Sequence, residues 1–166
     1  MVNETDDTDI ESTSGWWNSL VGGDFDNDGD LDLVLNNVNM PSFVYENRSK
    51  ELHPEHNTLS FSLHGELGNM FALGTKITLK LGNELIYQEA SPMRGFMSTV
   101  DNRIHVGLGK RNSVDTVWAE WPDGRVSILS NVKANQLVNL YEKDAISRKE
   151  VERKTLTKPF FHNTSE

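Results

Sequence analysis

The fold is decided most clearly by the stretch V-W-A-E-W-P-D-G-R-V-S-I, which spans residues 117–128. Its first half alternates between two faces, which is the period of a β-strand with one buried side. Pro122 presets φ for a turn and Gly124 accepts a positive φ, so a tight turn is expected between them. The stretch therefore predicts a β-hairpin, with Trp121 on the core face and Trp118 on the opposite face.

The same pattern recurs along the chain. Alternating or short apolar runs predict further strands at 16–21, 31–35, 43–45, 59–63, 77–81, 85–87 and 137–141. Gly82-Asn83 is a typical two-residue hairpin connection between two of these runs. No long stretch with helical period intervenes, so the expected fold class is all-β, with a sandwich or barrel-like domain.

Composition and charge exclude several classes of protein. The 166 residues contain no cysteine, which excludes disulfides, thiolate metal sites and cysteine nucleophiles. The net charge is −9, and residues 1–32 hold ten of the 25 acidic side chains without any lysine or arginine. Such a segment repels nucleic acid and anionic membranes and attracts cations. We therefore expect no nucleic-acid binding. No apolar run approaches the roughly 18 residues of a membrane span, so we expect no membrane insertion either.

The strongest chemical signal is the run D-F-D-N-D-G-D-L-D at residues 24–32. Carboxylates at loop positions 1, 3, 5 and 9, glycine at position 6 and a backbone carbonyl at position 7 suit a hard cation that takes six to eight oxygen ligands. An EF-hand needs an acidic residue at position 12, where this chain has Leu35, and a strand-like run follows in place of a helix. The pattern predicts a Ca²⁺ loop between two strands, and the alternative is a solvated acidic turn.

Residues 23–35 resemble the FG-GAP/VCBS repeat, whose calcium loop leads into an apolar strand, and Asn36-Asn37 fits its usual exit. The resemblance covers one repeat, about residues 16–48, and implies a hairpin like part of a β-propeller blade. It implies a metal site formed by Asp24, Asp26, Asp28, Asp32 and the carbonyl of Asp30. Because a lone blade cannot bury its faces, this hairpin is expected to pack on the rest of the chain or to be the remnant of a propeller.

Residues 59–142 resemble the ASPIC/UnbV domain. The motifs that carry this resemblance lie at 69–76, 94–98, 104–109, 114–117, 121–124 and 131–136. Leu73 and Val106 depart from the usual isoleucine and phenylalanine of these motifs, which we interpret as exchanges of core side chains. The resemblance implies a non-catalytic module in a bacterial protein that is secreted or exposed at the cell surface.

Together these features predict five segments. They are a flexible acidic leader (1–14), the calcium-loop repeat (15–48), a connector (49–57), the ASPIC/UnbV-like β domain (58–142) and a charged linker or tail (143–166). The tail ends in Lys158-Pro159-Phe160-Phe161, which resembles the start of a further repeat region. We therefore expect this chain to be a fragment of a larger protein.

Other side chains invite chemistry with less support. The connector carries His53-Pro54-Glu55-His56, but no matching ligands lie at a known spacing, so an ordinary connector is the favoured interpretation. His105 lies in an alternating strand and is expected to be packed or hydrogen-bonded. Trp118, if exposed, suits stacking against a sugar, and its alternative role is packing against the hairpin or another chain.

The sequence favours a non-enzymatic, calcium-binding module for adhesion or protein interaction. Two alternatives remain open: a carbohydrate-binding accessory module of a polysaccharide-handling system, and a non-catalytic part of a larger enzyme. Its expected partners are the remainder of the full-length chain and a protein or a glycan.

Overall fold

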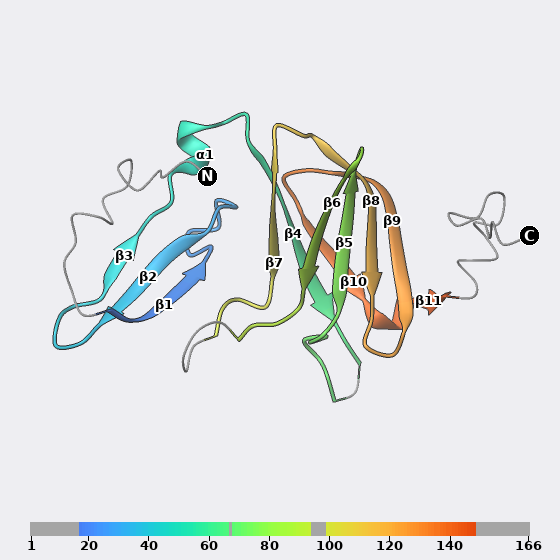
Figure 1. Cartoon of the computed structure of the whole chain (residues 1–166), viewed down its shortest axis with the longest axis horizontal. Coiled ribbons are helices and arrows are strands. Elements are labelled where there is room, and N and C mark those ends of the chain that lie inside the picture. The colour runs from blue at the N-terminus through green and yellow to red at the C-terminus, as the bar shows by residue number, and fades with distance from the viewer. Residues whose placement is uncertain (1–16, 67, 94–98, 149–166) are drawn as a thin grey trace, which may run out of the picture.

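The structure is a computed structural model that describes residues 17–66, 68–93 and 99–148 (Figure 1). Within these residues the regular secondary structure is almost all β-strand, and the strands form three sheets. The all-β prediction is confirmed, and the two sheets formed by residues 57–147 make a sandwich. The described residues show neither a closed barrel nor a propeller.

The N-terminal sheet is antiparallel and has the strand order β1-β2-β3. It comprises β1 (Trp17–Gly23), β2 (Asp32–Asn37) and β3 (Phe43–Tyr45). Gly23 pairs with Asp32, so the acidic run is the loop that closes the β1–β2 hairpin. A short helix, α1 (Ser49–Leu52), follows in the segment expected to be a connector, and it leads into the sandwich (Figure 1).

The sandwich has a three-stranded and a five-stranded sheet. The first has the order β10-β4-β7 and comprises β10 (Leu137–Tyr141), β4 (Asn57–His64) and β7 (Ile104–Gly109). The second has the order β11-β9-β8-β5-β6 and comprises β11 (Ile146–Ser147), β9 (Arg125–Lys133), β8 (Ser113–Glu120), β5 (Lys76–Leu81) and β6 (Glu84–Glu89). All pairs are antiparallel except β4 with β10, which run parallel.

The core lies between these two sheets. Strand β4 alternates strictly between buried and half-buried residues, and its Leu59 and Phe61 are fully buried. Trp121 is also buried, and its indole N–H donates to the hydroxyl of Ser127 at 2.9 Å. The predicted core position of Trp121 is therefore confirmed, and its one polar atom is satisfied, as burial requires.

The predicted turns are confirmed by their backbone geometry. Gly82 has φ +64° between β5 and β6, and Gly124 has φ +85° between β8 and β9. The sandwich also extends beyond residue 142, through a 3-10 turn, η2 (Glu142–Asp144), to β11. The expected leader at 1–14 and the tail beyond residue 148 lie outside the described residues.

The substitution Gly124→Val tests the hairpin turn. A Cβ at residue 124 would meet no atom within 4 Å, so the penalty comes only from the positive φ. We expect the free energy of unfolding, measured by chemical denaturation, to fall by about 1 kcal/mol or more.

Gly107→Val is the matched control, because residue 107 has the same open surroundings without a positive φ and lies exposed in β7. This variant should leave the free energy of unfolding nearly unchanged. Equal losses in the two variants would contradict the assignment of the penalty to backbone conformation.

Candidate metal centre

The acidic loop is shaped by its own backbone. Asn27 has φ +61° and Gly29 has φ +100°, so the backbone adopts a positive φ at two positions of the loop. The backbone N–H of Asp28 donates to the Asp26 carboxylate at 3.1 Å, and that of Asp30 donates to the Asp28 carboxylate at 3.0 Å. These two side-chain turns bring alternate carboxylates of the loop close together.

Three of the predicted ligands converge. Asp24, Asp26 and Asp28 each offer a carboxylate oxygen, and the three oxygens lie within 4.8 Å of one another. Asp24 and Asp30 are each only 9% exposed, and the Oδ1 atom of each is buried without a hydrogen-bond partner. Buried carboxylate oxygens without partners are costly, and a bound cation is one way to satisfy them.

The structure gives Asp32 a different place. Its two carboxylate oxygens accept hydrogen bonds from the backbone N–H groups of Phe25, at 3.0 Å, and Asn47, at 2.8 Å. Asp32 therefore joins the start of the loop to the chain that follows β3. Asp30 similarly accepts from the backbone N–H of Lys50 at 3.1 Å. Neither residue belongs to the group formed by the carboxylates of Asp24, Asp26 and Asp28.

Crowding of negative charge is visible in the loop. Burial raises the pKa of the Asp30 carboxyl, and repulsion by Asp28, Asp32 and Asp26 raises it further, against the hydrogen bond from Lys50. Ionisation of Asp30 is thus opposed by its surroundings, and a nearby divalent cation would relieve this opposition.

Two basic side chains reach the loop from elsewhere. The ammonium of Lys50, in α1, donates to the carbonyl oxygen of Asp28. Arg103, which precedes β7, lies 4.0 Å from an Asp24 oxygen and donates to the side-chain oxygen of Asn27 at 3.5 Å. The connector and the sandwich therefore both contact the loop, through contacts that the loop's own spacing does not reveal.

Burial around the loop is mainly polar. Leu35 is the one buried apolar side chain between residues 19 and 56, whereas Asp24, Asp30, Asp32 and Asn37 are all buried there. The N-terminal sheet consequently draws little stability from the hydrophobic effect. Its hydrogen bonds and the balance of charge in the loop must supply much of what holds it together.

A cavity of about 310 Å³ lies where the loop sheet meets the sandwich, and sequence reasoning missed it. Leu31 from the loop, Phe71 from the sandwich, and Arg103 and His105 contribute to its lining. Nδ1 of His105 lies 3.1 Å from the Ser60 hydroxyl, which confirms a hydrogen-bonded histidine. Burial lowers the pKa of His105. The cavity is lined by segments that lie far apart in the chain, so no local sequence motif predicts it.

The carboxylate of Asp32 can be tested as a structural tie that acts without metal. Asp32→Ala removes the acceptor of two backbone N–H groups and should destabilise the N-terminal sheet by about 2 kcal/mol in the presence of chelator. Amide hydrogen exchange of residues 19–47 measures this effect separately from the sandwich. Asp24→Ala is the control, because the Asp24 Oδ1 has no hydrogen-bond partner and its Oδ2 has only the 4.0 Å contact with Arg103. An equal increase of exchange in both variants would contradict the assignment.

Comparison with known proteins identifies the sandwich. The chain matches the model of the family described as ASPIC and UnbV over residues 65–147, which is half of the chain and includes every strand from β5 to β11. A search of curated proteins finds no match. In the described residues, no helix is long and apolar enough to cross a membrane. On the strength of the profile match and the sandwich beneath it, the chain belongs to the ASPIC and UnbV family.

Proposed function

We propose that this chain is a calcium-binding, non-enzymatic module of a secreted or cell-surface protein, with a role in adhesion or protein interaction. The observation that carries the proposal is the convergence of Asp24, Asp26 and Asp28, whose carboxylate oxygens lie within 4.8 Å of one another. The buried, unpartnered Oδ1 atoms of Asp24 and Asp30 add to it, because each is an acceptor that the protein leaves unused.

The donor set favours calcium over other divalent cations. All the converging groups are carboxylates, which are hard oxygen donors. Ca²⁺ accepts six to eight such ligands in flexible geometry, whereas Mg²⁺ demands a strict octahedron and keeps its water. Zinc and copper prefer nitrogen or sulfur ligands, which this loop lacks.

A bound ion would act on stability more than on chemistry. The N-terminal sheet buries few apolar side chains, so neutralising its carboxylates would add stability where the hydrophobic effect supplies little. The resemblance of residues 23–35 to the FG-GAP/VCBS repeat supports this role and an extracellular setting, where calcium is abundant. The proposed partners are the remainder of a longer chain and another surface protein.

A second candidate function is carbohydrate binding, and the register of the five-stranded sheet favours it. Trp118 pairs directly with Ile128 on one side and Thr78 on the other, and Thr78 pairs with Tyr87. Directly paired residues share a face, so these side chains form a row on the outer face, opposite buried Val117. Trp118 is half-buried and Tyr87 is 54% exposed, which leaves two aromatic rings for stacking against a sugar.

Thermal melts with calcium and with chelator test the first proposal. With a Kd of about 10⁻⁴ M and about 2 mM free calcium, binding stabilises the fold by about 1.8 kcal/mol. This gain should raise Tm by several degrees, and magnesium should do so weakly. Asp28→Asn keeps an acceptor for the N–H of Asp30 but replaces a charged ligand by a neutral one, so it should clearly reduce the calcium-dependent gain.

Glu46→Gln is the control for this experiment. It removes one negative charge from the same part of the chain, at an exposed position outside the converging group. The calcium-dependent rise in Tm should persist in this variant. A parent protein whose Tm is the same in calcium and in chelator, with no binding heat in calorimetry, would refute the proposal.

Native electrophoresis through gels that contain soluble polysaccharides tests the second candidate. A glycan bound by the aromatic row should retard the parent protein, and Trp118→Ala should lose most of that retardation. Tyr141→Ala is the control, because Tyr141 is an exposed aromatic residue of β10, in the other sheet. Unretarded migration of the parent through every polysaccharide tested would argue against this function.

A further inference from the structure

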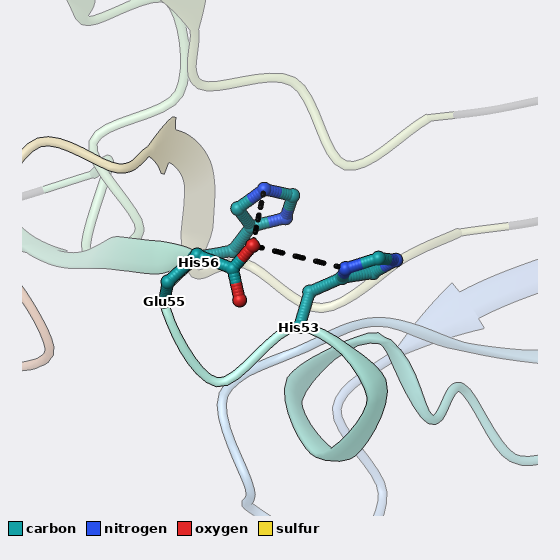
Figure 2. Close-up of side chains that lie close together, drawn as sticks. All are labelled: His53, Glu55 and His56. Carbon is teal, nitrogen blue, oxygen red and sulfur yellow. Dashed lines mark ion pairs between the residues drawn. The ribbon is translucent and has the colours of Figure 1, made fainter.

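A second cluster of metal-binding side chains lies in the turn between α1 and β4, apart from the acidic loop. Figure 2 shows that His53 and His56 both face the carboxylate of Glu55. Nδ1 of His53 and Nε2 of His56 each lie 4.0 Å from the same oxygen, Oε1 of Glu55. One donor atom from each of the three residues lies within 4.8 Å of the other two.

The backbone holds this cluster in place. The N–H of His56 donates to the carbonyl of His53 at 2.8 Å, which closes a turn with Pro54 at its second position. Proline presets φ there, so little conformational freedom is left to lose when the turn binds an ion. On the side of α1, the N–H of His53 donates to the carbonyl of Ser49 at 2.8 Å.

The other end of the turn is anchored to the sandwich. Asn57, the first residue of β4, is buried, donates to Asn112 at 3.1 Å and accepts from Asn135 at 2.6 Å. The turn therefore joins a helix to a firmly held strand. Its three donor side chains stay exposed, so an ion from solution has access to them.

We propose that His53, Glu55 and His56 form a site for a divalent transition metal ion, with Zn²⁺ as its representative. Two imidazole nitrogens and one carboxylate oxygen are a donor set that zinc, copper and nickel accept and that calcium does not favour. Tetrahedral zinc with bonds near 2.1 Å needs donor atoms about 3.4 Å apart. The Glu55 oxygen lies 4.0 Å from each imidazole nitrogen, and all three donor atoms lie within 4.8 Å of one another. Rotation of the exposed side chains would have to bring them to the bonding separation, with water in the remaining position.

The electrostatics around Glu55 both support and limit the site. Its own backbone N–H lowers the pKa of the Glu55 carboxyl, and Lys110 lowers it further, so the carboxylate is ionised at neutral pH. The Lys110 ammonium lies 3.5 Å from Oε1, the oxygen that faces both imidazoles. A cation placed among these groups is repelled by Lys110. Removing this charge should therefore strengthen metal binding.

Zinc titration of the full chain tests the proposal. With ZnCl₂ as the probe and millimolar calcium present to occupy the acidic loop, calorimetry should show one zinc ion bound per chain. His53→Ala and His56→Ala should each weaken binding by about tenfold or more, since each removes a ligand. Lys110→Gln should strengthen binding by about threefold or more, because a nearby positive charge is lost.

Long-range ¹⁵N NMR of the imidazole rings checks which atoms bind the ion. Zinc should shift Nδ1 of His53 and Nε2 of His56, while His64, a histidine of β4 outside the cluster, should be unaffected. His64→Ala and Asp28→Asn serve as controls and should bind zinc like the parent.

Three outcomes would overturn the proposal. The first is the absence of saturable zinc binding to the parent protein. The second is undiminished zinc binding by the double variant that combines His53→Ala with His56→Ala. The third is loss of zinc binding in Asp28→Asn. The last outcome would place zinc in the acidic loop. Calcium-dependent stability is measured in a separate experiment. A negative result for zinc therefore does not affect the proposed calcium function.

Discussion

Mutual repulsion among the carboxylates of residues 24–32 is the constraint on which the N-terminal part of the structure depends. The loop brings the side chains of Asp24, Asp26 and Asp28 together and buries Asp24 and Asp30 almost completely. Charge held at low dielectric must be paired, hydrogen-bonded or neutralised. The protein meets part of this demand with backbone donors, with Lys50 and with Arg103, and two carboxylate oxygens remain without partners.

The two parts of the molecule are stabilised by different forces. In the sandwich, two sheets bury a continuous apolar core that includes Phe61 and Trp121, and this burial is nearly independent of ions. The N-terminal sheet buries mainly polar side chains, so we expect its stability to depend on the charge of its acidic residues. Asp30 links the loop to the connector through Lys50, and Arg103 reaches the loop from the sandwich. A change of charge in the loop would therefore alter the interactions at both of these contacts.

Strands and turns were predicted well from the sequence because their signals are local. Alternation placed Trp121 in the core, and the glycines at 82 and 124 adopt the positive φ that their turns require. The small elements α1, η2 and β11 were not predicted, since each is too short to carry a periodic signal and forms through its neighbours. Of the five aspartates, three converge, while Asp32 serves backbone donors that lie 7 and 15 residues away.

By itself, the sequence determined the all-β class, the hairpin turns and the place of the acidic loop, because alternation, turn residues and carboxylate spacing act over a few residues. Tertiary structure alone decided how that loop is used. It brought Lys50 and Arg103 to the carboxylates, formed the cavity beside His105 and set Trp118 in a row with Tyr87. It also turned His53, Glu55 and His56 toward one another. Such groupings depend on sheet register and on side-chain direction, which the spacing of residues along a chain does not specify.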